Sequence, residues 1–250
     1  MAFPNTYTIG ITSLGYQVIW STLAKREDID VRRLFTDQSE TLHKKIDLFG
    51  ITLSWELDGP IILNLLEKQK IPIWSNNRKE EDPIVFGGGP VLTANPEPLA
   101  PFFDVILLGD SEELLPKFLD SLHTNKGLSR SNLLKNLAQI PGIYIPSLYE
   151  PKYTNDGTLI DVEPITTDIP KTIKKQTWKG NNLCHSSVIT PNSAWPNIHM
   201  VEVVRSCPEL CRFCLASYLT LPFRTSSLED GLIPAVEKGL KATNKIGLLG

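Results

Sequence analysis

The apolar residues in the first half of the chain gather in short runs, and amphipathic segments separate these runs. A segment that is apolar on successive residues is typical of a strand buried on both faces of a parallel sheet. On this pattern we predict strands at Tyr7–Ile11, Ile29–Leu34, Leu48–Leu53, Ile84–Phe86, Val105–Leu108 and Ile143–Ile145. Helices are predicted to begin at Gly59-Pro60 and at Asp110, which forms a capping box with Glu113. Strands that alternate with helices predict an α/β fold with a doubly wound parallel sheet and helices on both faces.

The pattern changes near residue 149, where prolines and polar residues begin to dominate. We predict a linker up to residue 197 that contains a β-hairpin over Tyr153–Val162. A strand at His199–Val204, a helix capped by Ser227 and a strand at Ile246–Leu249 then predict one βαβ unit. Such a unit cannot bury its own faces, so we expect it to be the start of a larger (β/α) structure.

Composition and charge exclude several classes of protein. The chain of 250 residues is 41% hydrophobic and 21% charged, with a formal net charge of −3. These values are ordinary for a globular protein and do not indicate a nucleic-acid partner. No apolar run approaches the roughly 20 residues of a membrane span. The N-terminus lacks a secretory pattern, and four cysteines are too few for a disulfide scaffold, so we expect a cytoplasmic protein without a membrane partner.

Three of the four cysteines, Cys207, Cys211 and Cys214, lie within eight residues of one another. Their spacing is C-x3-C-x2-C, on a loop after a predicted strand, where α/β barrels build their sites. Thiolates are soft ligands that suit iron–sulfur clusters, zinc or Cu(I). Three thiolates on a four-iron cluster leave one iron open for another ligand. The alternatives are a zinc site with His185 or His199 as the fourth ligand, and inert buried thiols.

The segment from Cys207 to Cys214, with Phe213 before the last cysteine, resembles the signature of the radical S-adenosylmethionine (SAM) enzymes, C-x3-C-x-φ-C with φ aromatic. The resemblance implies that the three cysteines hold a 4Fe-4S cluster whose open iron chelates SAM. It implies that an external electron donor of the flavodoxin or ferredoxin type drives cleavage of SAM to a 5′-deoxyadenosyl radical, which abstracts hydrogen from a substrate, here unknown. Phe213 would pack near the adenine, and Arg205 and Arg212 either offset the charge of the cluster or face solvent.

The family also has a glycine-rich turn, often Gly-Gly-Glu, after the second strand of its barrel. The corresponding residues here are Leu248-Leu249-Gly250, which depart from that pattern and leave only Gly250 as a match. By the resemblance, we expect Gly250 to contact the amino group of SAM.

The N-terminal half resembles the flavodoxin-like cobalamin (B12)-binding domain of one class of radical SAM proteins, and nearly the whole chain resembles a bacterial family of that class. Gly87, Gly88 and Gly89 follow a predicted strand, so their backbone can approach a flat or anionic ligand, and Ser54 ends another strand at the same crevice. A tight strand-to-loop turn is the alternative interpretation of the glycines. The family's Asp-x-His-x-x-Gly element is missing after the first strand, so cobalamin is a candidate cofactor without a histidine ligand.

Together these patterns predict a B12-binding-like domain over residues 1–148, a linker over 149–197 and the first part of a radical SAM barrel over 198–250. Because such a barrel needs about 200 residues, we expect a truncated fragment that is inactive alone. The predicted function of the full-length form is that of a radical SAM enzyme, with cobalamin assistance left open. The alternative is a non-catalytic zinc or cluster protein whose α/β domain binds a nucleotide or cofactor.

Overall fold

The computed structural model describes residues 1–41 and 45–250. Its contacts divide the chain into two compact units. The central unit is Lys44–Gln176, and the terminal unit joins Met1–His43 with Thr177–Gly250. The sequence instead predicted one domain over 1–148 and a linker over 149–197, so the two divisions place the first residues of the chain differently.

The central unit is built on a four-stranded sheet in the order β1-β2-β3-β4. Its elements are β1 (Leu48–Thr52), α3 (Gly59–Lys68), β2 (Ile84–Gly88), α4 (Pro90–Ala94), β3 (Val105–Leu107), α5 (Ser111–Thr124), α6 (Arg130–Leu137), β4 (Ile143–Tyr144), β5 (Tyr149–Tyr153) and β6 (Leu159–Pro164), with 3-10 turns at Glu56–Asp58, Ser75–Asn77, Ala100–Phe102 and Pro146–Leu148. Strands β1, β2 and β3 are parallel, and β4 pairs with β3 in the antiparallel direction. The α/β fold class with a parallel sheet is therefore confirmed.

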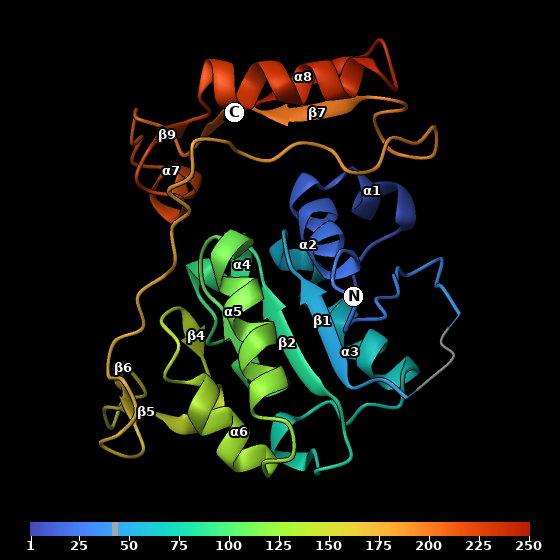
Figure 1. Cartoon of the computed structure of the whole chain (residues 1–250). Coiled ribbons are helices and arrows are strands. Elements are labelled where there is room, and N and C mark those ends of the chain that lie inside the picture. The colour runs from blue at the N-terminus through green and yellow to red at the C-terminus, as the bar shows by residue number, and fades with distance from the viewer. Residues whose placement is uncertain (42–44) are drawn as a thin grey trace. The chain divides into compact units, whose positions relative to one another are not determined.

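The strands of this sheet are apolar because helices cover them. Helix α5 turns Leu114, Leu115 and Phe118 into the core, and the ring of Phe118 lies 5.1 Å from that of Phe86 on β2. Figure 1 shows α5 running across the sheet. The predicted hairpin is also present, because β5 and β6 pair in the antiparallel direction around a turn that contains Gly157.

The terminal unit is built around the pair β7 and β10, which are parallel and adjacent. Its elements are α1 (Tyr7–Thr12), α2 (Leu14–Ala24), β7 (His199–Glu202), β8 (Val204–Arg205), α7 (Leu215–Leu219), β9 (Arg224–Thr225), a π-helical turn at Leu228–Leu232, α8 (Ile233–Leu240) and β10 (Ile246–Leu249). Helix α8 lies along β7 (Figure 1), and Ser227 accepts a hydrogen bond from the backbone of Asp230 at the start of the preceding turn. The predicted βαβ unit is therefore confirmed.

Two predicted strands are wrong. The segment Tyr7–Ile11 forms helix α1, although three of its five residues are β-branched and favour a strand. Helix α1 brings Gly10 so close to Phe35 that a Cβ would lie 2.5 Å from the ring, and this packing outweighs local preference. Residues 29–34 form no strand beyond two isolated bridges of Leu34, to Ala2 and to Ser39, and the side chain of Arg33 pairs with Glu40 at 2.7 Å.

Residues predicted as linker pack against the N-terminal helices of the terminal unit. The side-chain oxygen of Gln17 accepts hydrogen bonds from the backbone of Ser187 at 2.9 Å and of Val188 at 3.0 Å. The hydroxyl of Thr12 accepts another from the backbone of Ala194 at 2.8 Å. Because Gln17 is buried, these bonds satisfy a side chain that would otherwise be costly to enclose.

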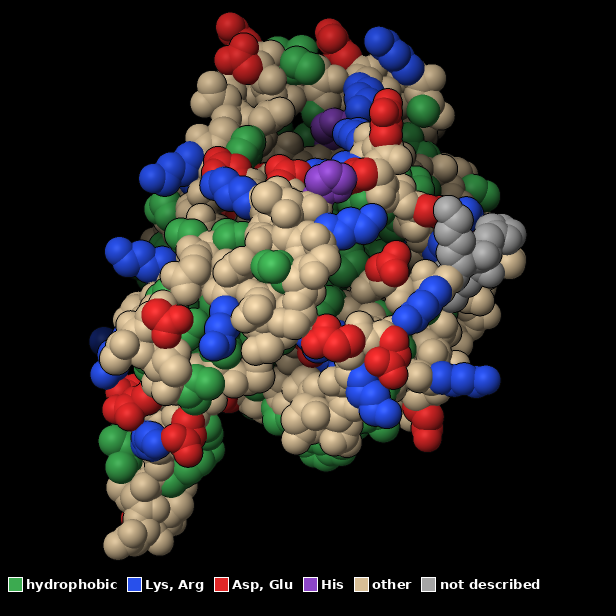
Figure 2. Space-filling view, turned by 60° about the horizontal axis from the view of Figure 1, so that its bottom comes forward, with side chains coloured by type: hydrophobic (Ala, Val, Ile, Leu, Met, Phe, Trp, Pro, Cys, Tyr) green, Lys and Arg blue, Asp and Glu red, His purple; other side chains and the backbone are tan. Residues whose placement is uncertain are grey.

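The surface carries charges of both signs. Acidic and basic side chains are interspersed over the face displayed in Figure 2. Among the described residues, no helix combines the length and the apolar character that crossing a membrane requires.

Candidate functional site

The cysteine loop, residues 206–214, connects β8 to α7 within the terminal unit. Strand β8 itself follows the carboxyl end of the parallel pair β7 and β10, where the backbone N–H of Val203 donates to the carbonyl of Leu249 at 2.7 Å. The thiols of Cys207, Cys211 and Cys214 are all free, and Cys211 is exposed while the other two are half-buried. The loop therefore carries three accessible soft donors on one short segment.

Hydrogen bonds fold this loop back onto α7. The hydroxyl of Ser206 donates to the carbonyl of Ser217 at 2.8 Å, and the hydroxyl of Tyr218 donates to the carbonyl of Leu210 at 2.7 Å. Ser206 and Leu210 both have positive φ, at 75° and 46°, so the backbone reverses direction at these two points. Turns of this kind bring successive residues of a short segment toward one side.

Cys214 occupies the N-cap of α7, and its surroundings favour the thiolate. Hydrogen bonds from the backbone N–H of Ser217, and then from its hydroxyl, lower the pKa of the Cys214 thiol. The hydroxyl of Ser217 lies 3.8 Å from the Cys214 sulfur. A thiolate is the form that binds metals, so this cysteine is prepared for ligation.

The three sulfurs do not form a finished metal site. Within residues 1–41 and 45–250, no three His, Cys, Asp or Glu side chains are grouped closely enough to hold a metal ion. The donor set fits a cluster in its chemistry, because three free thiols share one loop, yet the loop must tighten to bring them to one centre. His185 and His199 lie together, with ring centroids 5.5 Å apart, and neither forms such a group with the cysteines.

The structure brings Gly250 to the start of the cysteine loop. A Cβ on Gly250 would lie 2.5 Å from the side chain of Val204, so no larger residue fits without a shift. Phe213 is 92% exposed and offers an open ring face on the same loop. Gly250, the residue after β10, and the loop with the three cysteines and Phe213 thus follow the carboxyl ends of β10 and β7.

The glycines of the central unit are explained by packing. A Cβ on Gly87 would lie 2.4 Å from the ring of Phe103, and one on Gly89 would lie 2.4 Å from the carbonyl oxygen of Leu53. Gly89 also has φ of 114°, which favours glycine. Gly88 pairs with Thr52 on β1, and Ser54 follows that strand with an exposed side chain. These residues share one edge of the sheet, and the tight-turn interpretation accounts for Gly87 and Gly89.

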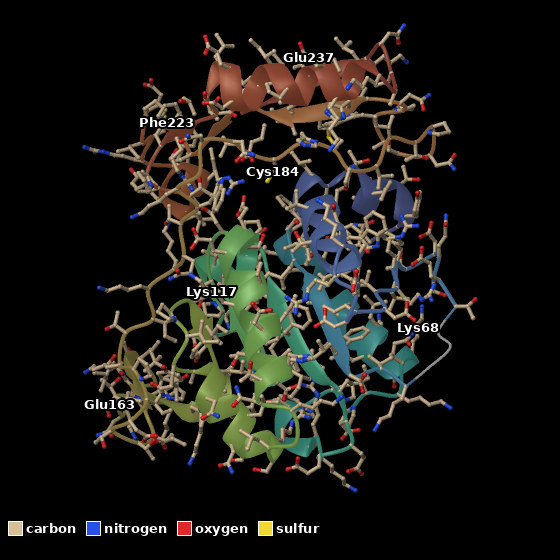
Figure 3. The ribbon with its side chains drawn as sticks, viewed as in Figure 1. Lys68, Lys117, Glu163, Cys184, Phe223 and Glu237 are labelled. Atoms are coloured by element: carbon tan, nitrogen blue, oxygen red, sulfur yellow. The ribbon has the colours of Figure 1, made fainter. Side chains whose placement is uncertain are left out.

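Sequence reasoning missed the partners of Arg205. Residues 184–186 lie beside β7, because the backbone N–H of Glu202 donates to the carbonyl of Cys184 at 2.8 Å. Arg205 donates two hydrogen bonds to the carboxylate of Glu202, both at 2.8 Å, and one to the sulfur of Cys184 at 3.3 Å. Figure 3 marks Cys184 on this segment. Arg205 and Cys184 are about twenty positions apart in the sequence, so no local pattern reveals their contact.

Comparison with known proteins gives one family. Residues 16–146, just over half of the chain, match the family model described as "Radical SAM proteins, N-terminal". An uncharacterized protein of Methanocaldococcus jannaschii is 27% identical over 251 residues, which cover 99% of this chain and 47% of that protein. The chain thus spans about half the length of the curated relative that it matches. No solved structure matches.

Proposed function

The chain belongs to the radical SAM proteins, and from that premise we propose that its cysteine loop holds a 4Fe-4S cluster for a radical SAM reaction. Cys207, Cys211 and Cys214 are the proposed ligands. The observation that carries the proposal is the set of three free thiols on one loop at the carboxyl end of parallel strands. When bound, such a cluster supplies the electron that cleaves SAM to a 5′-deoxyadenosyl radical. The substrate and the external electron donor belong to the proposal for the whole protein.

The chain's own residues support distinct parts of this role. The hydrogen bonds from Ser217 lower the pKa of the Cys214 thiol and so favour the thiolate form that binds a metal. The exposed ring of Phe213 presents a flat apolar face near which the adenine of SAM would pack. A Cβ on Gly250 would meet the side chain of Val204, so packing already accounts for this glycine, and its contact with the amino group of SAM rests on the family resemblance.

Two of the four residues proposed for cobalamin, Gly87 and Gly89, give no support to a step through that cofactor. The positions that a side chain would fill at Gly87 and Gly89 are already occupied by Phe103 and Leu53. Packing therefore explains these glycines without a ligand. The proposed function accordingly rests on the cysteine loop alone.

Anaerobic reconstitution with iron and sulfide tests the proposal. The wild-type protein should take up about four irons per chain, and Cys211→Ala should lose most of this iron because one ligand is missing. Cys184→Ala is the matched control, since it removes a thiol outside the loop and should retain the iron. Stoichiometric zinc that persists in air, with no cluster formed, would instead support a zinc protein and refute the proposal.

A further inference from the structure

A compact network of polar residues lies directly before the cysteine loop. The carboxylate of Glu202 accepts hydrogen bonds from the backbone N–H of Cys184 at 3.0 Å and from Arg205 through two nitrogens at 2.8 Å. The side chains of Arg205 and Glu202 are only 11% and 17% exposed. A two-pronged guanidinium–carboxylate pair of this kind fixes both partners in one orientation.

The same guanidinium also reaches the sulfur of Cys184 at 3.3 Å. Arg205 therefore links two segments, the extended residues before β7 and the strand β8 that leads into the loop. Its backbone pairs with Arg224 on β9, so β8 is held on both its main-chain and its side-chain sides. The chain turns at Ser206, directly after this anchor, and reaches Cys207 at the next residue.

We propose that Arg205 is a positioning residue for the cysteine loop, and that it places Cys207 for metal binding through its paired hydrogen bonds to Glu202. This rests on the proposed function, in which Cys207 is a ligand. The sulfur of Cys184 accepts only a weak hydrogen bond from the same guanidinium and contributes no ligand. The planar guanidinium of arginine is required, because a lysine ammonium cannot bond both carboxylate oxygens in this paired geometry.

Cobalt binding to the metal-free protein under anaerobic conditions tests the proposal without the cluster. The intensity of thiolate-to-Co²⁺ charge-transfer absorption per bound metal reports how many sulfurs bind it. In Arg205→Gln, Arg205→Lys and Glu202→Gln we expect Co²⁺ affinity to fall about tenfold or more. The absorption per bound cobalt should fall by about one third, as for two thiolates in place of three. Simple loss of folded protein lowers the amount of cobalt bound but leaves the absorption per bound cobalt unchanged.

Two further variants serve as controls. Glu209→Gln makes the same charge change as Glu202→Gln, at an exposed position of the cysteine loop. Its Co²⁺ affinity and absorption per bound cobalt should match those of the wild type. Cys184→Ala should keep the wild-type absorption per bound cobalt. Wild-type signals in the Arg205 and Glu202 variants, rescue by Arg205→Lys, or a drop in Cys184→Ala would each overturn the proposal.

The outcome separates this proposal from the proposed function. If the wild-type protein binds Co²⁺ through three thiolates but takes up no iron–sulfur cluster, the proposed function fails and the role of Arg205 stands. If the wild-type protein binds no Co²⁺, the loop is not a metal site and the role of Arg205 fails with it.

Discussion

Gly89 and Gly127 have similar backbone conformations but very different surroundings. Both have positive φ, at 114° and 96°. A Cβ on Gly89 would lie 2.4 Å from a backbone oxygen of Leu53, whereas a Cβ on Gly127 would meet nothing within 4 Å. At Gly89 the close approach is made by the neighbouring strand, which is why the sequence could show a need for glycine without showing what approaches it.

Alanine substitution separates these two effects. Gly127→Ala should cost about 1–2 kcal/mol of stability, from the left-handed backbone alone. Gly89→Ala should cost about 1–3 kcal/mol more, since overlap with Leu53 forces a backbone shift. Urea unfolding of both variants measures the difference, and equal losses would show that the Leu53 contact is unimportant.

Asp104 joins three elements of the central unit through one buried oxygen. It accepts hydrogen bonds from Arg78 at 2.9 Å, Arg130 at 2.8 Å and the backbone of Val85 at 2.8 Å. The side chains of Arg78 and Asp104 are almost fully buried. Two guanidinium groups therefore share a single carboxylate, while other N–H groups of both donate to backbone carbonyls.

Removing that carboxylate leaves two cations without their shared anion. Asp104→Asn should lower the free energy of unfolding by about 3–5 kcal/mol, measured by urea denaturation. The control is Glu113→Gln, which breaks an exposed pair with Lys117 on α5 and should cost at most about 0.5 kcal/mol. Similar losses in the two variants would contradict the structural role of Asp104.

Elements differ in how far their sequence determines them. The runs that became β1, β2 and β3 are apolar on successive residues, and β10 begins and ends where the pattern predicted. Residues 7–11 have an equally strand-like pattern but form a helix, because Gly10 packs onto Phe35. The local pattern determines the secondary structure of a segment that is buried along its whole length. Tertiary contacts determine it where the packing of one glycine or one aromatic ring dominates.

The candidate site shows the same division across the whole molecule. Cysteine spacing identified the loop, because its chemistry is local to eight residues. The anchor formed by Cys184, Glu202 and Arg205 depends on the segment before β7 returning beside that strand, which is a property of the folded unit. The pattern of apolar residues likewise did not predict that residues 1–43 belong to one unit with residues 177–250. That grouping depends on contacts of single side chains such as Gln17.

Two neighbouring histidines make the terminal unit sensitive to acid. Burial lowers the pKa of His199, and the nearby ring of His185 lowers it further, while burial also lowers the pKa of His185. The Nε2 of His199 donates to the carbonyl of Ala235 at 3.0 Å. Its Nδ1 is buried without a hydrogen-bond partner among the described residues, so a proton there would have no acceptor.

The sign of the pH dependence follows from these lowered pKa values. Below about pH 6.5 the histidines of the unfolded state bind protons, whereas those of the folded state stay neutral to a lower pH. The free energy of unfolding therefore falls as the pH falls. The slope is at most about 1.4 kcal/mol per pH unit for each histidine, the limit for one proton bound in the unfolded state alone. Hydrogen exchange of peptides from β7 and α8, corrected for intrinsic rates, should report the loss between pH 7 and pH 5.5.

Substitution of the pair identifies the source of the effect. The double variant His185→Gln with His199→Gln should show a flatter pH dependence in β7 and α8, even if its stability at pH 7 is lower. His123→Gln, at an exposed position of α5 in the central unit, should leave that dependence unchanged. If the double variant kept the wild-type slope, acid sensitivity would have to come from other groups. If β7 and α8 of the wild type kept their full protection from hydrogen exchange at pH 5.5, protonation of the histidines would not affect the stability of the terminal unit.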